Sequence, residues 1–185
     1  PERLTVAAAF ARHAGVDLLA TISDGVGDRR RLAVAAASAG IRAADDDSWS
    51  DLFSKLIVAR VEPQLGIGRP TILFEYPIGE AALARRSPED PRVAERFELY
   101  VAGVELANAF GELTDAAEQR RRFEADMAEK QRLHGERYPI DEDLLSALAA
   151  MPPTAGIALG FDRLAMLACG ARTIADVQWE PPADR

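Results

Sequence analysis

Three carboxylates, an amide and an arginine fall within two apolar segments of the chain. The first segment, FELYVAGVELANAFGE, covers residues 97–112, and the second, GIALGFDR, covers residues 156–163. The five polar residues are Glu98, Glu105, Asn108, Glu112 and Arg163. Apolar residues alternate with these polar ones, and Gly or Asp marks the ends, which favours sites built on strands. Carboxylates beside an arginine could bind a metal ion and the phosphate groups of a ligand.

The first segment predicts a hairpin over residues 93–110 with its turn at 102–103. In that register Glu98 opposes Ala107, and Glu98 and Glu105 are diagonal neighbours on one face, roughly 5 to 8 Å apart at Cβ. Two carboxylates held in this way repel each other unless a cation or a donor lies between them. Mg²⁺ bridging nucleotide phosphates is an economical occupant. The alternative is a solvent-exposed acidic sheet face, and spacing alone does not choose between the two.

Asn108, Phe110 and Glu112 share one strand parity, which is opposite to that of Glu98 and Glu105 in a regular strand. If all five residues serve one pocket, a bulge or a strong twist must occur near residue 107. Phe110 could then pack on an alkyl chain, Glu112 could meet an ammonium group, and Asn108 could orient the polar end of a ligand. The other interpretation is that Asn108 and Glu112 merely mark a strand end and a helix entry.

Arg163 follows Asp162, which is predicted to cap the last helix of the chain. In the first turn of a helix, backbone NH groups already favour anions, and a guanidinium adds a fork suited to phosphate oxygens. Gly160 would let a nucleotide approach the backbone closely. Alternatively, Arg163 only pairs with a neighbouring carboxylate.

These segments need a scaffold of helices and strands. Helices are predicted after six capping residues, and Gly40, Gly135 and Gly170 are predicted to end three of them. The capping residues are Thr5, Asp28, Ser48, Asp115, Asp141 and Asp162. Residues 71–76 read as a strand, and GIALGF reads as a buried strand. We expect a single domain, mainly helical over residues 1–68, with the sheet over residues 69–185. The acidic run 45–47 is interpreted as a loop rather than a calcium site, because EF-hand spacing is absent.

Composition narrows the class of protein. The 185 residues suit one domain, and no run approaches the ~20 apolar residues that a membrane span requires. The net charge of −8 weighs against a nucleic-acid surface, and the run Arg120 to Arg122 is read as a solvated helix face. The sole cysteine, Cys169, is expected to pack in the last helix, and no zinc-site spacing exists. No signal peptide is visible, so a cytoplasmic protein is expected. Pro1 in place of Met suggests a fragment.

Nearly the whole chain resembles a known family. The segments RFELYVAGVELANAFGELTDAAEQRRRF, MPPTAGIALGFDRLAML and ARTIADV resemble the C-terminal part of the catalytic core of class II lysyl-tRNA synthetases. The likeness extends to VEPQLG, RPTILFEYP and EDPRVAERFELY. It is strongest to the truncated relatives of these synthetases, the elongation factor P (R)-β-lysine ligases.

The resemblance implies an α+β fold with a mainly antiparallel sheet flanked by helices, and it identifies GIALGFDR as motif 3 of the family. It implies that Glu98 and Glu105 hold Mg²⁺ and ATP, with the backbone of Leu106 near the adenosine. Asn108, Phe110 and Glu112 would form the lysine pocket, with Glu112 reading an amino group. Gly160 and Arg163 would contact ATP, and Arg163 would be the catalytic residue that neutralises charge.

One position separates the close relatives. Lysyl-tRNA synthetases typically carry GLGIGIDR where this chain has GIALGFDR, so that Ala158 replaces a glycine, and the ligase group shows that alanine. A methyl group added to an amino acid pocket shifts discrimination by roughly 1 to 3 kcal/mol. The implied substrate is β-lysine, with α-lysine as the weaker alternative, and the implied protein partner is elongation factor P.

The chain departs from the family pattern in one respect. Motif 1, which forms the dimer, and motif 2, which carries an arginine for the ATP α-phosphate, would lie upstream of Pro1. The full-length protein is expected to be a homodimer, and the chain by itself could be inactive. Two rivals remain: a lysyl-tRNA synthetase core that acts on tRNA, and a noncatalytic synthetase-like binding module.

Overall fold

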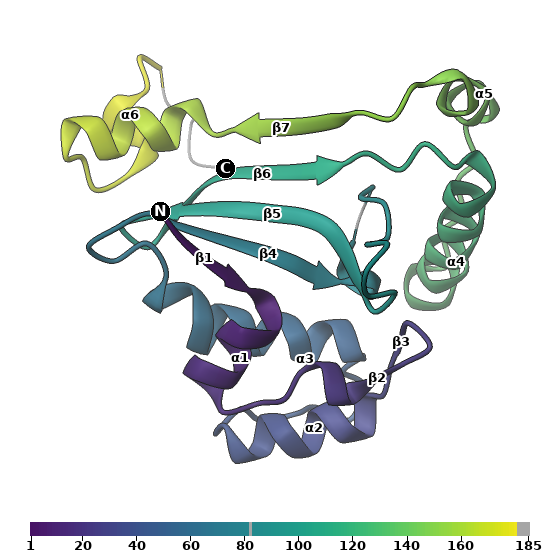
Figure 1. Cartoon of the computed structure of the whole chain (residues 1–185), viewed down its shortest axis with the longest axis horizontal. Coiled ribbons are helices and arrows are strands. Elements are labelled where there is room, and N and C mark those ends of the chain that lie inside the picture. The colour runs from purple at the N-terminus through teal and green to yellow at the C-terminus, as the bar shows by residue number, and fades with distance from the viewer. Residues whose placement is uncertain (82, 181–185) are drawn as a thin grey trace.

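A five-stranded sheet forms the centre of the molecule (Figure 1). The computed structural model describes residues 1–81 and 83–180. The strand order is β1 (Glu2–Thr5), β4 (Thr71–Pro77), β5 (Val93–Val101), β6 (Val104–Gly111) and β7 (Ala155–Leu159). The pair β1–β4 is parallel, whereas β4–β5, β5–β6 and β6–β7 are antiparallel. The expected α+β fold with a mainly antiparallel sheet is therefore confirmed.

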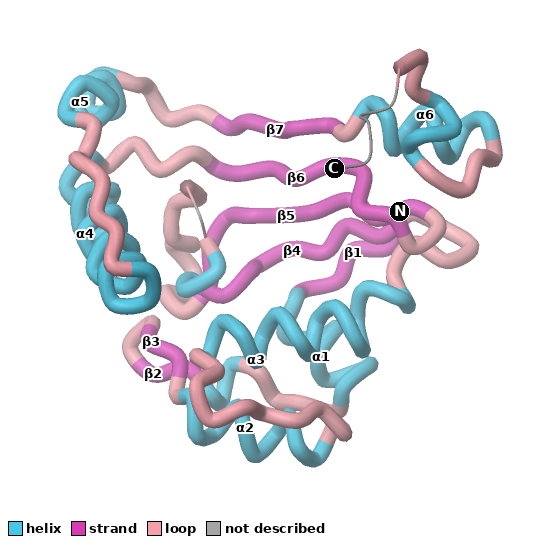
Figure 2. Tube along the Cα trace, turned by 180° about the vertical axis from the view of Figure 1, so that it is seen from behind, coloured by secondary structure: helices cyan, strands magenta, loops and turns pink. Residues whose placement is uncertain are grey.

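Three helices form a layer on the β1–β4 side of the sheet: α1 (Val6–Ala14), α2 (Arg29–Ser38) and α3 (Trp49–Leu56), with α2 packed against α3 and farthest from the strands (Figures 1 and 2). Each begins at the predicted capping residue, because the side chains of Thr5, Asp28 and Ser48 accept hydrogen bonds from the backbone NH groups of the first turn. Three of the predicted helices are thus present with their predicted caps. The short strand β1, however, also lies in this part and joins the sheet, which the sequence reading missed.

The main hydrophobic core joins these helices to the sheet. Phe53 of α3 stacks between Phe10 of α1 and Trp49, with ring centroids 5.1 and 5.6 Å apart. Leu73 of β4 and Tyr100 of β5 belong to the same buried cluster. Burial of such aromatic and aliphatic side chains is the dominant favourable term in folding. One face of the sheet is thereby anchored to the helical layer near β4.

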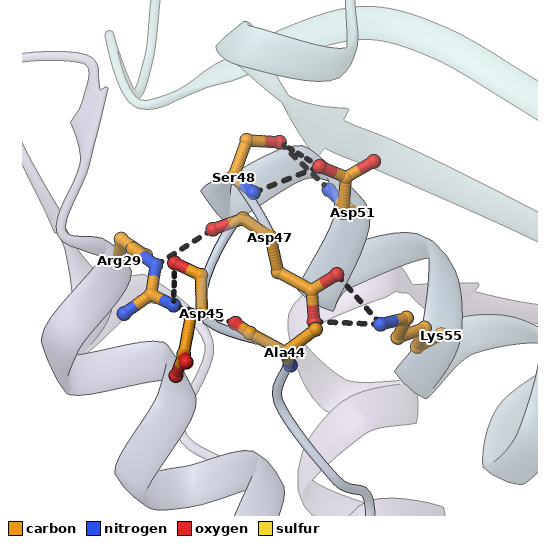
Figure 3. A network of polar contacts seen from close by, with 7 residues as sticks. All are labelled: Arg29, Ala44, Asp45, Asp47, Ser48, Asp51 and Lys55. Atoms are coloured by element: carbon orange, nitrogen blue, oxygen red, sulfur yellow. Dashed lines mark hydrogen bonds and ion pairs between the residues drawn. The ribbon is translucent and has the colours of Figure 1, made fainter.

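The acidic run at residues 45–47 is a structural loop, as expected (Figure 3). The carboxylate of Asp47 accepts hydrogen bonds from the Ala44 NH at 2.7 Å and from Lys55 Nζ at 2.6 Å. The Arg29 guanidinium donates to the carbonyl oxygens of residues 44, 45 and 47. Ser48 and Asp51 form a reciprocal cap at the start of α3. The Arg29 guanidinium and the Asp47 carboxylate therefore fix the loop that leads into α3.

The remaining helices lie at the two ends of the strands (Figure 1). Helices α4 (Ala116–His134) and α5 (Glu142–Ala150) lie at one end, and α6 (Phe161–Cys169) continues from β7 at the other. The caps Asp115 and Asp141 are as predicted. A two-stranded ribbon, β2 (Ile22–Ser23) and β3 (Val26–Gly27), was not predicted. Arg120 and Arg121 of α4 are accessible to solvent and pair with Glu142 and Glu118, as expected for a solvated helix face, whereas the Arg122 side chain is largely covered and donates to the Ala84 carbonyl oxygen at 2.8 Å.

Three details of the C-terminal part differ from the prediction. Strand β7 is an exposed edge strand rather than a buried one, with Ile157 63% exposed. The cap of α6 is Gly160, without a side-chain hydrogen bond, and Asp162 lies one residue inside the helix. Cys169 is exposed rather than packed. The exposure of β7 follows from its position at the edge of the sheet, where an apolar run meets one neighbouring strand instead of two.

The β5–β6 hairpin turn and the end of α6 lie where the sequence predicted them. The turn of the β5–β6 hairpin is formed by Ala102 and Gly103, both with positive φ, as predicted for a two-residue hairpin loop. Gly170 ends α6 in the left-handed conformation.

Among the described residues, no helix combines the length and the apolar character that crossing a membrane requires.

Candidate active site on the β5–β6–β7 face

A β-bulge at Leu106 brings the candidate residues onto one face of the sheet. Tyr100 pairs with Glu105, but the next pair is Leu99 with Ala107, so Leu106 has no partner in the ladder. The bulge was expected near residue 107 and is confirmed at residue 106. Because the extra residue reverses the alternation, side chains with odd numbers before it and even numbers after it share a face. Glu105 and Asn108 can therefore lie on the same face of the sheet although one has an odd and the other an even number.

The bulge also corrects the predicted register. Glu98 pairs with Asn108, not with Ala107. The predicted register assumed a ladder without a bulge, and the extra residue shifts every pair beyond it by one. Asn108 in turn pairs with Ala158 of β7. Glu98, Asn108 and Ala158 therefore lie in one row across three strands, on the face that also carries Glu105.

Glu98 is buried and accepts hydrogen bonds from three donors. It is 6% exposed, and its Oε1 accepts a hydrogen bond from Arg96 Nη2 at 2.6 Å. Its Oε2 accepts hydrogen bonds from the hydroxyl groups of Tyr76, at 2.5 Å, and Tyr100, at 2.7 Å. Burial, and then the negative charge of Glu98, raise the pKa of both phenols, so they remain hydrogen-bond donors. Three donors hold one carboxylate in a fixed orientation.

Tyr76 reaches Glu98 because the backbone changes its alternation at Glu75. Glu75 has a φ of 60°, and the ladder between β4 and β5 shifts register between Phe74 and Tyr76. A residue with a side chain rarely adopts this conformation, and such strain is found most often at functional sites. Leu73 and Tyr76 thereby lie on the same side of β4. The sequence pattern could not reveal this, since Tyr76 has the wrong parity.

Glu105 and Arg163 form an ion pair at the open end of this face. Arg163 Nη1 lies 3.2 Å from Glu105 Oε2 and donates a hydrogen bond to the Glu105 carbonyl oxygen at 2.8 Å. The Arg163 side chain is 44% exposed, and the Glu105 side chain is 35% exposed. A Cβ on Gly160 would lie only 3.3 Å from Arg163 Cδ, so the glycine makes room for the arginine chain. The NH of Gly160 donates to the carbonyl oxygen of Leu106 at 2.8 Å, which ties α6 to the bulge.

Phe110 and Arg96 form the middle of the face. These two residues pair across the strands β5 and β6. The Arg96 guanidinium lies over the ring of Tyr76, 4.3 Å from its centroid, and 5.7 Å from the centroid of Phe110. Arg96 Nη1 also donates to the carbonyl oxygen of Glu80 at 2.5 Å. The cation is therefore held between two rings while it neutralises Glu98.

Asn108 has an amide oxygen that is buried without a hydrogen-bond partner among the described residues. A buried acceptor without a donor costs about 1 to 3 kcal/mol. Such a group is expected where a ligand supplies the missing donor. Its position between Glu98 and Ala158 agrees with a role in orienting a polar ligand.

Glu112 directly follows the last residue of β6 and lies beside Gly156 of β7. The point where a Cβ on Gly156 would stand is 2.5 Å from Glu112 Oε1. Real Cβ atoms are almost never so close to an oxygen, so the carboxylate occupies space that only a glycine leaves free. The backbone of Glu112 is fixed by a hydrogen bond from its NH to the Thr154 carbonyl oxygen at 3.0 Å. Gly156 was not assigned this role from the sequence.

A hollow of about 280 Å³ opens beside Glu105 and Arg163. Its wall includes Tyr100, the hairpin turn at Gly103, and Glu62, which the sequence reading did not single out. A larger hollow of about 670 Å³ lies over the opposite face, between Phe74, Phe97 and Ile157. Glu105 and Arg163, which the sequence singled out, line the smaller hollow, whereas the larger one is lined by apolar side chains together with charged groups such as Arg85 and Glu95.

Sequence reasoning missed four residues of the site: Glu62, Tyr76, Arg96 and Tyr100. Arg96 and Tyr100 stand two residues on either side of Glu98, so the strand period could have found them. Glu62 lies in a separate helical segment, and no sequence pattern connects it with the hairpin. The structure is needed to bring it to Tyr100, where its Oε1 lies 3.4 Å from the hydroxyl oxygen.

The described residues include no cluster of three or more His, Cys, Asp or Glu side chains that could hold a metal ion. Two carboxylates on the face can be tested as ligands for Mg²⁺. Glu105 fits, because its carboxylate is partly exposed and opens to the hollow. Glu98 fits less readily: a carboxylate has about four acceptor positions, and three donors already use three of them. Any Mg²⁺ here would take few protein ligands and keep water or phosphate oxygens.

Several curated proteins that share one name are similar in sequence to the chain. Proteins named elongation factor P–(R)-β-lysine ligase from Salmonella dublin, Salmonella paratyphi B and Salmonella heidelberg are each 45% identical to the chain over 179 residues. The match covers 95% of this chain and 53% of each relative. The chain thus spans about half the length of the curated relatives it matches.

The family described as tRNA synthetases class II (D, K and N) matches residues 50–182, which include the β5–β6 hairpin, β7 and α6. This range covers well over half of the chain. The mainly antiparallel sheet flanked by helices is in keeping with the match. The chain belongs to the class II tRNA synthetase family of the D, K and N type.

Proposed function

We propose that the protein activates (R)-β-lysine with ATP and transfers it to a lysine side chain of elongation factor P. The observation that carries the proposal is the Leu106 bulge, which gathers Glu105, Asn108 and Phe110 on one face. The names of the relatives, which are 45% identical, supply the substrate class. Cytoplasmic location would follow from a partner that acts in translation.

The ATP end of the proposed site is the hollow beside Glu105 and Arg163. The negative charge of Glu105 is neutralised by the positive charge of Arg163. Mg²⁺-bound ATP brings a cation for the carboxylate and phosphate oxygens for the guanidinium, so it can replace their mutual pairing without leaving a charge alone. Gly160 and the backbone of Leu106 would line the approach of the nucleotide.

Glu105 is the proposed main protein ligand of Mg²⁺, with Glu98 as a second ligand. When bound, the ion would neutralise charge on the phosphates and orient them for displacement. Arg163 would contribute its positive charge to the same phosphates as the catalytic residue. Arg96, Tyr76 and Tyr100 hold Glu98 in place for this role.

The amino acid end is formed by Asn108, Phe110, Glu112 and Ala158. The unpaired amide oxygen of Asn108 can accept a hydrogen bond from an amino group. Phe110 offers an apolar surface to the methylene chain, and the Glu112 carboxylate can pair with an ammonium group. Ala158 narrows the pocket beside Asn108, which would favour the β isomer over α-lysine.

The proposed reaction has two steps. The carboxylate of β-lysine attacks the α-phosphorus of ATP, and pyrophosphate leaves with formation of an aminoacyl-adenylate. An amine of elongation factor P then attacks the acyl carbon, and AMP leaves. No protein nucleophile is required, so catalysis rests on positioning and on charge neutralisation.

A second candidate is a lysyl-tRNA synthetase core, which the family description supports. The net charge of −8 and Ala158 favour the ligase. The same resemblance implies a homodimer for the complete enzyme. A noncatalytic binding module is the third possibility.

The mass of elongation factor P tests the proposal. The protein, as this chain and as the complete reading frame where that extends further, is incubated with ATP and either isomer of lysine. The proposal predicts a mass increase equal to one β-lysyl group. Charging of tRNA(Lys) without modification of elongation factor P would instead identify a synthetase. No product on either acceptor, with retained ligand binding, would identify the binding module.

A further inference from the structure

Glu62 stands on a segment that is locked to the active-site hairpin. It opens the 3₁₀ turn Glu62–Gln64, directly after a π-helical turn at Ile57–Val61. Single π turns occur frequently at functional sites. The carbonyl oxygens of Leu65 and Gly66 accept hydrogen bonds from the backbone NH groups of the hairpin turn, at 3.1 and 2.8 Å. Glu62 therefore keeps a fixed position relative to the strands that carry Glu98 and Glu105.

Gly66 makes this attachment close. A Cβ at this position would lie 2.7 Å from the backbone carbonyl group of Tyr100, and the φ of Gly66 is +73°. Only glycine accepts both conditions without strain. The contact brings the Glu62 segment directly against the end of β5, where Tyr100 lies.

The hydroxyl group of Tyr100 stands between two carboxylates. Its oxygen lies 2.7 Å from Glu98 Oε2 and 3.4 Å from Glu62 Oε1. A phenol has one proton to donate, and O–H···O hydrogen bonds are usually 2.5 to 3.0 Å long. The proton is therefore directed to Glu98, and Glu62 is a second acceptor within reach of a rotation about the C–O bond.

The surroundings of Glu62 favour such an arrangement. Burial raises the pKa of Glu62, and the charges of Glu98 and Glu105 raise it further, whereas the Tyr100 hydroxyl lowers it. The charged and titratable groups that share its hollow are Tyr100, Glu105 and Arg163. A donor from Tyr100 would thus stabilise the ionised form of Glu62.

We propose that Glu62 is a positioning residue, which takes over the Tyr100 hydroxyl when Glu98 turns to the metal ion of the nucleotide. Release of Tyr100 leaves Glu98 with two acceptor positions in place of one, while Tyr76 and Arg96 keep it oriented. Glu62 prevents the freed hydroxyl from remaining buried without a partner. The inference rests on the proposed function, because that function requires the nucleotide and its ion.

The first test follows Tyr100 directly. The chain has three tyrosines, so selective ¹³Cζ labelling gives three resonances, and Tyr100→Phe identifies one of them. Addition of Mg²⁺ and ATP should shift the Tyr100 resonance, and Glu62→Met should abolish that shift. Glu62→Gln keeps an oxygen acceptor and should restore part of it. An unmoved Tyr100 resonance in the unsubstituted protein, or a normal shift in Glu62→Met, would overturn the inference.

The second test asks whether Glu62 acts through Tyr100. Glu62→Met should raise the Mg²⁺ concentration for half-maximal ATP–pyrophosphate exchange by roughly three- to tenfold, the usual worth of one hydrogen bond. The double variant with Tyr100→Phe should be no worse than Tyr100→Phe alone. Additive losses would contradict an action through Tyr100. Glu89→Gln, which removes an equal charge from an exposed loop, is the matched control.

The two tests separate the two proposals. If no lysine isomer supports exchange, the proposed function fails, yet the Tyr100 resonance still reports on Glu62 because it needs only Mg²⁺ and ATP. If exchange is normal in Glu62→Met at every Mg²⁺ concentration, the role of Glu62 is wrong and the proposed function stands.

Discussion

Glu112 Oε1 lies 2.5 Å from the point at which a Cβ atom on Gly156 would stand. The carboxylate therefore rests directly over the backbone of β7, in space that an alanine would fill. This relationship fixes the distance between the proposed amino-group ligand and the row formed by Asn108 and Ala158. The absence of a side chain at Gly156 therefore helps to set the position of the Glu112 carboxylate.

Substitution of Gly156 by alanine should displace the Glu112 carboxylate. We expect KM for the amino acid to rise roughly tenfold or more, because small misplacements of a positioned group are costly. KM for ATP should change little, since Glu105 and Arg163 lie at the other end of the face. Gly79→Ala is the matched control, because a Cβ there meets open space. Steady-state exchange kinetics with both substrates varied would measure the effect, and equal losses for both substrates would contradict it.

Glu112→Gln removes the charge that should pair with the substrate ammonium group. Loss of one charge-assisted hydrogen bond of about 1.5 to 3 kcal/mol predicts a loss of roughly 10- to 150-fold in kcat/KM for the amino acid. ATP binding, measured by calorimetry, should stay near the unsubstituted value. If ATP binding falls by the same factor, Glu112 is a structural residue and the amino acid end has been misassigned.

Ala158→Gly tests the choice of isomer. Removal of one methyl group beside Asn108 should widen the pocket and change the ratio of kcat/KM for β-lysine and α-lysine by roughly 10- to 100-fold toward α-lysine. Residue 158 is exposed on an edge strand, so stability should be nearly unchanged apart from the cost of the glycine itself. A ratio that does not move would remove Ala158 from the specificity argument.

Arg163→Ala should act on the nucleotide. Loss of a guanidinium that neutralises phosphate charge predicts a fall of roughly 100-fold or more in the rate of exchange at saturating amino acid. Arg163→Lys should recover only part of it, because an ammonium group lacks the planar fork. The double variant with Glu105→Gln would show whether the ion pair itself matters. Unchanged exchange in Arg163→Ala would mean that the pair is only structural.

The buried carboxyl group of Glu80 should make the stability of the folded protein depend on pH. Its Oε1 is buried without a hydrogen-bond partner among the described residues, and burial raises the pKa of this carboxyl group. A raised pKa in the folded state means that the protonated form is favoured, so stability present at low pH is lost as the pH rises through the folded pKa. Glu80→Gln should therefore raise the melting temperature at pH 7 by roughly 2 to 4 °C, the equivalent of about 1 kcal/mol.

The same comparison at about pH 4 should show a smaller difference, because the carboxyl group of the unsubstituted protein is then largely protonated. Thermal melts followed by circular dichroism at the two pH values provide the measurement. A gain that is equal at both pH values, or a loss at neutral pH, would show that the ionised carboxylate is not a source of instability.

The sequence could predict the fold well where local chemistry decides it. Thr5, Asp28 and Ser48 cap helices because their side chains bond the first turn, and Ala102–Gly103 forms the hairpin turn because both positions need positive φ. Strand β1 was missed, because four residues carry too little periodicity. Burial of β7 was also misjudged, since an apolar run does not reveal whether it has one neighbour or two.

The candidate site could be predicted only in part. A bulge near residue 107 was expected only if Glu105 and Asn108 serve one pocket, and a bulge does occur at Leu106. Which residue bulges, and hence that Glu98 faces Asn108, depends on backbone geometry that alternation does not encode. Tyr76 enters the site through the strained backbone of Glu75, and Glu62 enters through a loop that docks on the hairpin turn. Contacts between distant segments of this kind appear only in three dimensions.

ATP–pyrophosphate exchange with (R)-β-lysine and with α-lysine tests the central claim most directly. It should be measured on this chain and on the complete reading frame where that extends further, at saturating Mg²⁺ and ATP. The account predicts exchange that depends on lysine and is faster with β-lysine by at least roughly tenfold in kcat/KM. Preference for α-lysine would contradict the proposed substrate, and the absence of lysine-dependent exchange from the complete protein would contradict the proposed function itself.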